Sequence, residues 1–244
     1  MNFNQAVYEA ILKKINEGIK ELQEKFDAFI DKINWLISLA KNFAQWLFDR
    51  IQDAVNLLQK AINAVIQLII DSLEGCWAPV LFFKRGMDWH NNVKHPMKEY
   101  AASVASDKLV SSDDWEGRAG NRYREATADQ KTAGDACATI GSQMGTNLIV
   151  CAGGGLAFYT AIGVALAKLI AALIASAAAA ATVVGAPPAA GAATVSAGVT
   201  TGEIIAASAA LLAFLGTQAT TISNVSAAFS EFPYSHWPSG TSKK

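Results

Sequence analysis

A regular series of apolar residues between Val7 and Leu73 constrains the fold more than any other feature of this chain. Its members recur in steps of three and four residues, and their mean spacing of about 3.67 is close to the period of an α-helix. Acidic and basic residues occupy the other face. No proline interrupts the series, and Gly18 is the only glycine before position 75. The pattern predicts one very long amphipathic helix, or two such helices joined by a tight turn. The mixed charges on the polar face favour packing in a helical bundle over binding flat on a membrane.

Helix stop and start signals follow this series. Gly75 and Pro79, within the sequence GCWAP, predict the end of the first helical region. The next residues, VLFFKRGMDW at 80–89, are apolar and aromatic but aperiodic, which indicates a connector. Pro96 suits the first turn of a short helix, which we expect to run from about His95 to Val110.

The distribution of charge divides the chain into a charged part and an apolar part. The polar residues 111–114 supply helix caps, and a second apolar series continues from Ala119 to Ile162. Between positions 148 and 230 only Lys168 and Glu203 carry charge. We therefore expect the helix that begins after the polar turn to continue unbroken into the apolar part.

Small residues and prolines at 185–202 (GAPPAAGAATVSAGVTTG) indicate the turn of an apolar helical hairpin. Alternating strand patterns are absent from the sequence, so the predicted fold is all-α, with a long N-terminal amphipathic helix, a helix-turn-helix and this hairpin. In chain order, the expected segments are the long helix and connector at 1–94, the helix-turn-helix at 95–147, the apolar hairpin at 148–230 and a flexible tail at 231–244.

Composition argues against several classes of function. A net charge of −1 gives no electrostatic basis for binding nucleic acid. His90 and His95 are five residues apart, which is not the spacing of a helical metal pair, and no phosphate-binding loop or nucleophile motif occurs. We expect no enzyme activity, no cofactor and no metal. The three cysteines, Cys76, Cys137 and Cys151, do not form a disulfide framework, because at least one is left unpaired within a monomer. The alternatives are a single bridge from Cys76 to Cys137 or Cys151 in an oxidising compartment, and cysteines that serve as small core residues, which we favour.

The polar turn contains the motif Trp115-x-Gly117-x-Ala119-x-x-x-Tyr123 between two helical stretches. This motif resembles the WxG superfamily of type VII secretion substrates, which are helical hairpins with Trp-x-Gly in the turn. The resemblance implies that Trp115, Gly117, Ala119 and Tyr123 form a recognition surface for a helical partner or the export machinery. The alternative is that Trp115 anchors the loop on its own bundle.

The resemblance covers about residues 95–150, and the chain departs from the family pattern in one respect. Many members or their partners carry Tyr-x-x-x-Asp/Glu after the second helix, whereas Tyr123 is followed at that spacing by Thr127, and no other tyrosine has an acid there. The longer secretion-associated members combine a WxG turn with additional Ala/Gly-rich helices, and the chain is most similar to those.

The apolar hairpin has three interpretations. It forms a tight helix pair buried in a soluble protein or homo-oligomer, it inserts into membrane lipid as part of a pore-forming protein, or it is a constitutive membrane anchor. Large contiguous apolar surfaces mark a partner or a membrane, and we favour self-association. The residues expected to make these contacts are Ile149, Gly154, Phe158, Ile162, Leu166, Lys168, Ile205, Leu212, Phe214 and Leu215.

Together these features predict a non-enzymatic type VII secretion substrate or secretion-associated protein, with a helical membrane-inserting or pore-forming protein as the alternative. The N-terminal residues MNFNQAVYEAILKK lack the basic and apolar parts of a secretory signal. We therefore expect a secreted or cell-envelope protein without a cleavable signal peptide.

Overall fold

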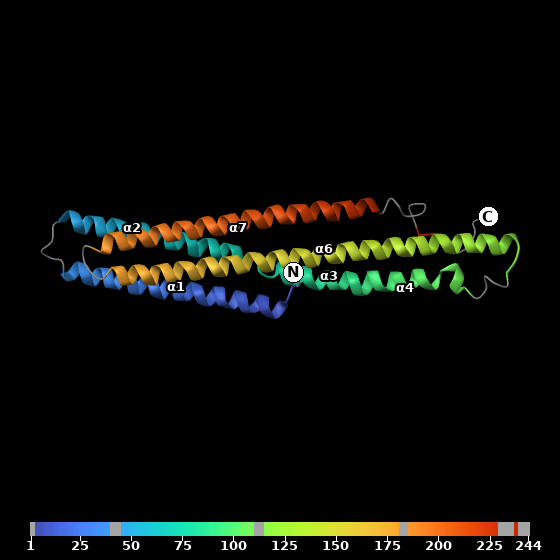
Figure 1. Ribbon diagram of the computed structural model, residues 1–244, viewed down its shortest axis with the longest axis horizontal. Coiled ribbons are helices and arrows are strands. Elements are labelled where there is room, and N and C mark those ends of the chain that lie inside the picture. The colour runs from blue at the N-terminus through green and yellow to red at the C-terminus, as the bar shows by residue number, and fades with distance from the viewer. Residues whose placement is uncertain (1–2, 40–44, 110–114, 181–184, 229–236, 239–244) are drawn as a thin grey trace. The chain divides into compact units, whose positions relative to one another are not determined.

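The computed structural model describes residues 3–39, 45–109, 115–180, 185–228 and 237–238 of the 244-residue chain. No β-strand occurs in these ranges, and the predicted all-α class is confirmed. The elements, labelled in Figure 1 where there is room, are α1 (Gln5–Leu39), α2 (Gln45–Leu73), α3 (Ala78–Trp89), the π-helix η1 (His90–Lys94), α4 (His95–Ser103), the 3-10 helix η2 (Ser106–Lys108), α6 (Arg118–Ala179) and α7 (Ala186–Ala228).

The chain forms two compact units, each built from separate segments. The bundle unit comprises Asn4–Trp77 and Gly155–Leu212, and the turn unit comprises Met1–Phe3, Ala78–Gly154 and Ala213–Lys244. Helices α6 and α7 contribute residues to both units. The sequence analysis divided the chain into consecutive segments, whereas each compact unit combines residues from several of those segments.

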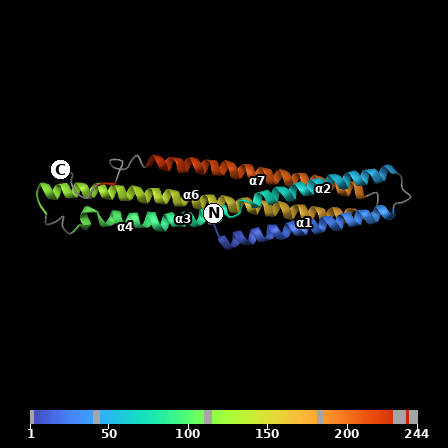
Figure 2. The same ribbon diagram turned by 180° about the vertical axis from the view of Figure 1, so that it is seen from behind.

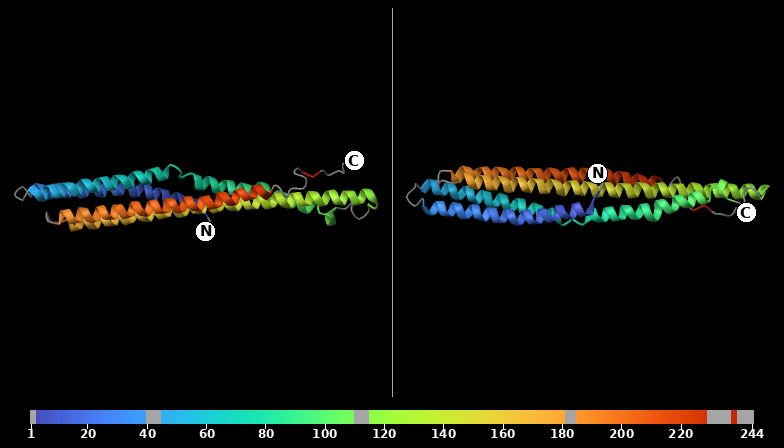
Figure 3. Two further views of the ribbon diagram at one scale, coloured as in Figure 1. Left: turned by 90° about the horizontal axis from the view of Figure 1, so that it is seen from above. Right: turned by 60° about the horizontal axis from the view of Figure 1, so that its bottom comes forward.

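Four helical segments build the bundle unit, and they lie in two layers (Figure 3). Helices α1 and α2 form one layer, and the adjoining parts of α6 and α7 form the other. The Tyr8 hydroxyl donates a hydrogen bond to the Cys76 carbonyl at 2.6 Å, so the start of α1 lies beside the end of α2 and the two helices are antiparallel. Gly18 lies against Leu166, which places α1 alongside α6.

The core of the bundle unit confirms most of the N-terminal apolar series. Of the two arrangements considered, the structure has two helices, and the residues between them, 40–44, lie outside the described part of the chain. Val7 is exposed, although the series placed it inside, and Tyr8 is fully buried in its place. The buried members of the series are Ile15, Leu22, Phe26, Phe29, Ile33, Leu36, Ile51, Leu58, Ile62, Val65 and Ile69.

Tyr8 belongs to a small polar cluster at one end of this core. Its ring meets that of Tyr159 edge to face, with 5.6 Å between the ring centroids. The Tyr159 hydroxyl donates to the Ser72 carbonyl at 2.7 Å, near the C-terminus of α2. Burial raises the pKa of the Tyr8 phenol above its usual value, so the hydroxyl remains a donor over the physiological pH range. The Tyr159 phenol thus satisfies a carbonyl in the last turn of α2, and the Tyr8 phenol satisfies one in the turn that follows the helix.

In the turn unit, α3, η1 and α4 form one helical stretch that runs along α6, as Figure 2 shows from the reverse side. The expected connector at 80–89 is wrong, because these residues belong to α3. The apolar periodicity did not reveal this helix because a glycine, Gly86, lies at the contact with α6, where the pattern requires a large apolar residue. A methyl group on Gly86 would lie 2.8 Å from the Gly145 carbonyl oxygen. The helix predicted from His95 begins there but ends at Ser103, short of Val110.

The predicted turn at 185–202 is also wrong, because α7 begins at Ala186 and includes nearly all of it. Pro187 and Pro188 lie in the first helical turn, where a missing backbone N–H breaks no hydrogen bond. The Ala189 N–H donates to the Gly185 carbonyl at 3.1 Å, which closes that turn. Alanine then favours helix strongly enough to include the glycines that follow. The unbroken helix expected from the polar turn into the apolar part is confirmed as α6.

Candidate functional site

The Trp-x-Gly segment lies directly before α6 in the turn unit. Gly117 has a φ of +92°, a conformation that side chains with a Cβ rarely adopt. Its carbonyl accepts a hydrogen bond from the Asn121 N–H at 3.0 Å, the first bond of the helix. Glycine is therefore required here by the backbone, and it sets the angle at which the chain enters α6.

Trp115 packs against Tyr123, two turns into α6. The ring centroids are 5.6 Å apart and the ring planes are inclined at 47°. Tyr123 is half-buried, whereas 45% of Trp115 remains exposed. Trp115 precedes the helix, so the turn at Gly117, which folds the chain back onto α6, brings the two aromatic rings together. The indole therefore contacts a side chain of the helix that follows it and remains partly exposed.

Two residues that the motif did not identify complete this turn. Gly120 is buried against the Trp115 carbonyl, and a Cβ at this position would overlap that oxygen. The Arg124 guanidinium donates from Nη2 to the same carbonyl and from Nη1 to Asn121 Oδ1, both at 2.9 Å. These contacts depend on how the chain folds back onto the first turn of α6, and no spacing in the sequence reveals them.

Ala119, the remaining motif residue, takes no part in these contacts. It is exposed on the first turn of α6. The polar residues at 111–114, predicted to cap the helix, lie outside the described residues. Much of the C-terminal tail, predicted to be flexible, also lies outside them, but the ring of Trp237 packs 5.5 Å from that of Tyr100.

The residues expected to form the contact surface of the apolar hairpin fall into three groups. Phe158, Ile162 and Leu166 are buried in the bundle unit and do not reach a free surface. In the turn unit, Ile149, Phe214 and Leu215 are half-buried, and Phe214 packs on Gly154 so closely that a methyl group there would lie 2.5 Å from the ring. Ile205 and Leu212, by contrast, are exposed on α7.

Apolar side chains cover the outward side of α7. Val195, Val199, Ile205 and Leu212 are all more than half exposed, and Leu212 reaches 70%. The one charged residue of this helix, Glu203, accepts a hydrogen bond from Lys168 of α6 at 2.9 Å. Lys168, predicted to belong to the contact surface of the hairpin, thus pairs with Glu203 within the same hairpin.

Three helical stretches of the described chain are long and apolar enough to cross a membrane: Asp49–Ser103, Arg118–Ala179 and Ala186–Val225. The Ala186–Val225 stretch is the least covered by the rest of the protein, with 11% of its apolar window buried. The membrane association anticipated for the hairpin thus has a basis in length and composition.

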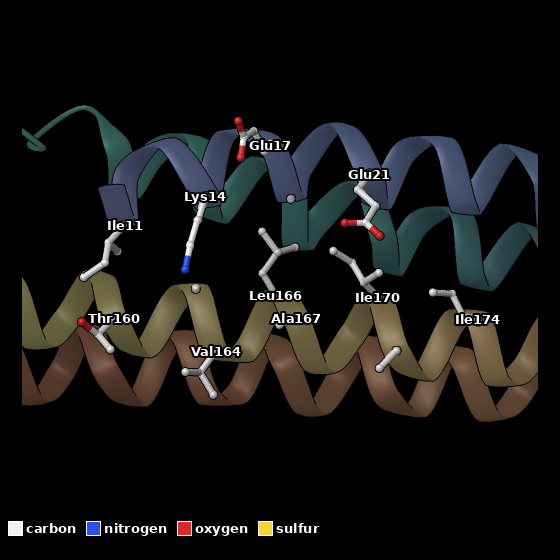
Figure 4. A pocket seen from close by; sticks show the side chains of 13 residues that line it. Ile11, Lys14, Glu17, Glu21, Thr160, Val164, Leu166, Ala167, Ile170 and Ile174 are labelled. Carbon is white, nitrogen blue, oxygen red and sulfur yellow. The ribbon is translucent and has the colours of Figure 1, made fainter. Parts of the chain in front are cut away.

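A groove of about 650 Å³ lies between α1 and α6 in the bundle unit (Figure 4). Its α1 side carries Lys14, Glu17 and Glu21, and its α6 side is mainly apolar, with Val164 and Ile174 among the lining residues. Lys14 extends toward α6 in this view. No histidine or cysteine is among the residues that line the groove.

Among the described residues, no group of three or more histidine, cysteine or acidic side chains is placed to hold a metal ion. Cys76, Cys137 and Cys151 are free thiols, and Cys151 is buried. Comparison of the chain with protein-family models, with curated proteins and with solved structures finds no match.

Proposed function

We propose that this protein is a non-enzymatic substrate or associated component of a type VII secretion system, and that its WxG turn is recognised by a helical partner or by the export machinery. The geometry of Trp115 carries the proposal. Gly117, at a positive φ, follows an indole that contacts the Tyr123 ring and is 45% exposed. A large, rigid and partly exposed aromatic ring is the kind of side chain that dominates protein interfaces.

The apolar helices support the second part of the proposal, that the protein self-assembles or contacts a membrane after or during export. An uncharged helical surface of this length in water favours association with another apolar surface. The exposed side chains of α7 provide that surface without any rearrangement of the helix.

Replacement of Trp115 by alanine tests the recognition role. We expect Trp115→Ala to reduce export by roughly tenfold or more in a bacterium that contains a type VII system, because truncation of an interface tryptophan removes a large share of the binding free energy. Immunoblots of the culture medium and of the cells measure the exported fraction. Trp77→Ala is the matched control, since Trp77 is also an exposed tryptophan but lies before α3, outside the motif. Equal export of the Trp115→Ala variant and the wild type would contradict the proposal.

The alternative function is that of a helical membrane-inserting or pore-forming protein. The three stretches long and apolar enough to cross a membrane favour it. Release of a trapped dye from lipid vesicles on addition of the pure protein distinguishes it, because secretion recognition alone requires no leakage.

A further inference from the structure

We infer that the outward side of α7 in the bundle unit is a surface for the hydrocarbon of a lipid bilayer, which the protein enters with α6 and α7 paired as a hairpin. This inference rests on the second part of the proposed function, contact through the apolar hairpin, and it names the partner of that surface.

The first observation is the breadth of the exposed apolar surface. At about 100° per residue, Val195, Val199, Ile205 and Leu212 span an arc of about 140° around α7. A seam with one other helix uses a narrower stripe. An arc this wide suits a medium that surrounds the helix, as lipid does.

The second observation is that seven hydroxyl groups of α7 are satisfied by the helix itself. In a bilayer, every polar group requires a partner within the protein, because water is absent. Each of these side chains donates to the carbonyl four residues earlier, at 2.8–3.1 Å: Thr194, Ser196, Thr201, Ser208, Thr217, Thr220 and Thr221. Their polarity is therefore no obstacle to entry into lipid.

The third observation concerns charge. Within 155–179 of α6 and 186–212 of α7, the only ionisable side chains apart from the phenol of Tyr159 are Lys168 and Glu203, and they form an ion pair at 2.9 Å. An isolated charge is costly in hydrocarbon, whereas a pair of opposite charges in hydrogen-bonding contact is nearly neutral as a unit. The pair joins α6 to α7, so the two helices enter together. Each of the two segments is longer than the about 20 residues that cross a bilayer core.

Flotation with large unilamellar vesicles of phosphatidylcholine tests the inference on the full chain, because these lipids have no net charge and the binding measured reports on hydrocarbon contact. We expect the wild-type protein to float with the vesicles. Ile205→Lys places a charge on the outward side of α7, and we expect it to lower the partition coefficient at least tenfold. Gln23→Lys, which adds the same charge at an exposed position on α1, is the matched control and should float like the wild type. Circular dichroism shows whether both variants keep their helices.

The ion pair has its own variants. Glu203→Gln leaves Lys168 without its acidic partner and should lower partitioning, and the double variant Lys168→Met, Glu203→Gln should restore it. An equal effect of the single and double variants would overturn the role of the pair.

Two other results would overturn the proposed surface. A wild-type protein that remains in the aqueous fraction as a discrete oligomer at every lipid concentration would assign the face of α7 to a second copy of the chain. Flotation of Ile205→Lys equal to that of the wild type would assign lipid contact to another surface. Neither result bears on recognition at Trp115, and Trp115→Ala should float normally, so failure here and failure of the export role are separate outcomes.

Discussion

Single residues of the WxG turn act through backbone geometry as much as through their side chains. Gly117 adopts a φ of +92°, and Gly120 packs against the Trp115 carbonyl. Arg124 binds that same carbonyl and so joins the loop to the first turns of α6. The exposed indole therefore sits on a rigid support, which is a condition for a side chain that recognises a partner.

Gly117→Ala is expected to lower the free energy of unfolding of the turn unit by about 1–2 kcal/mol, because alanine disfavours positive φ. The urea midpoint, followed by circular dichroism, measures the change. Gly216→Ala is the control in the same unit: a Cβ there meets no neighbour, as at Gly117, but Gly216 has ordinary helical φ. Alanine at 216 should stabilise the helix by up to about 1 kcal/mol. The explanation fails if both variants shift the midpoint in the same direction.

Among the helices, α6 and α7 differ in how the protein covers them. Within the bundle unit, α6 contributes large side chains to the core, and Ile162, Leu169 and Leu173 are among those that are buried. α7 contributes mostly small residues to the core, such as Ala193 and Ala197, and most of its larger apolar side chains are exposed, although Ile204 is buried. A helix that is apolar on all sides is normally buried or in a membrane, and α7 is exposed on one side. This contrast makes α7 the element most suited to an external apolar partner.

Adjacent residues on α6 provide a test of this difference between its faces. Leu173 is fully buried, whereas Ile174 is 47% exposed. Leu173→Ala should lower the free energy of unfolding of the bundle unit by about 2–5 kcal/mol, through lost burial and the cavity left behind. Ile174→Ala should change it by no more than about 0.5 kcal/mol. Thermal or urea denaturation of the two variants under the same conditions measures both values, and similar losses would show that the faces are not as described.

For the whole molecule, the exposed apolar surface predicts self-association in water. We expect the detergent-free protein to form a discrete oligomer of several times 25.8 kDa, because association covers the exposed side chains of α7 before any bilayer is present. Size exclusion with light scattering measures the molar mass. Ile205→Lys should shift the population toward the monomer, whereas Gln23→Lys should not. A monomeric wild-type protein would contradict the expected self-association.

The sequence by itself determined the class of the fold, the helical N-terminal region and the unbroken course of α6 from the polar turn into the apolar part. The apolar series from Val7 and the one from Ala119 follow a period that the α-helical backbone imposes locally, so they can be identified without knowledge of the partner surface. The contact between Trp115 and Tyr123 was not predicted from the sequence, because Trp115 lies outside α6 and reaches Tyr123 through the turn at Gly117. The error at 185–202 arose because glycine, proline and alanine carry little periodic signal. At 80–89 the apolar residues are aperiodic, and a glycine, Gly86, makes a close contact with α6.

Only the tertiary structure decided which apolar residues are covered. Phe158 and Ile205 are both large apolar residues in the apolar part of the sequence. Phe158 is buried in the bundle unit, whereas Ile205 is exposed on α7. The support of Trp115 by Gly120 and Arg124 and the pairing of Lys168 with Glu203 were likewise absent from any local pattern. These features depend on contacts between residues distant along the chain or on the path of a turn. Such contacts are made when the helices pack together, whereas the periodic pattern reports only on the local formation of each helix.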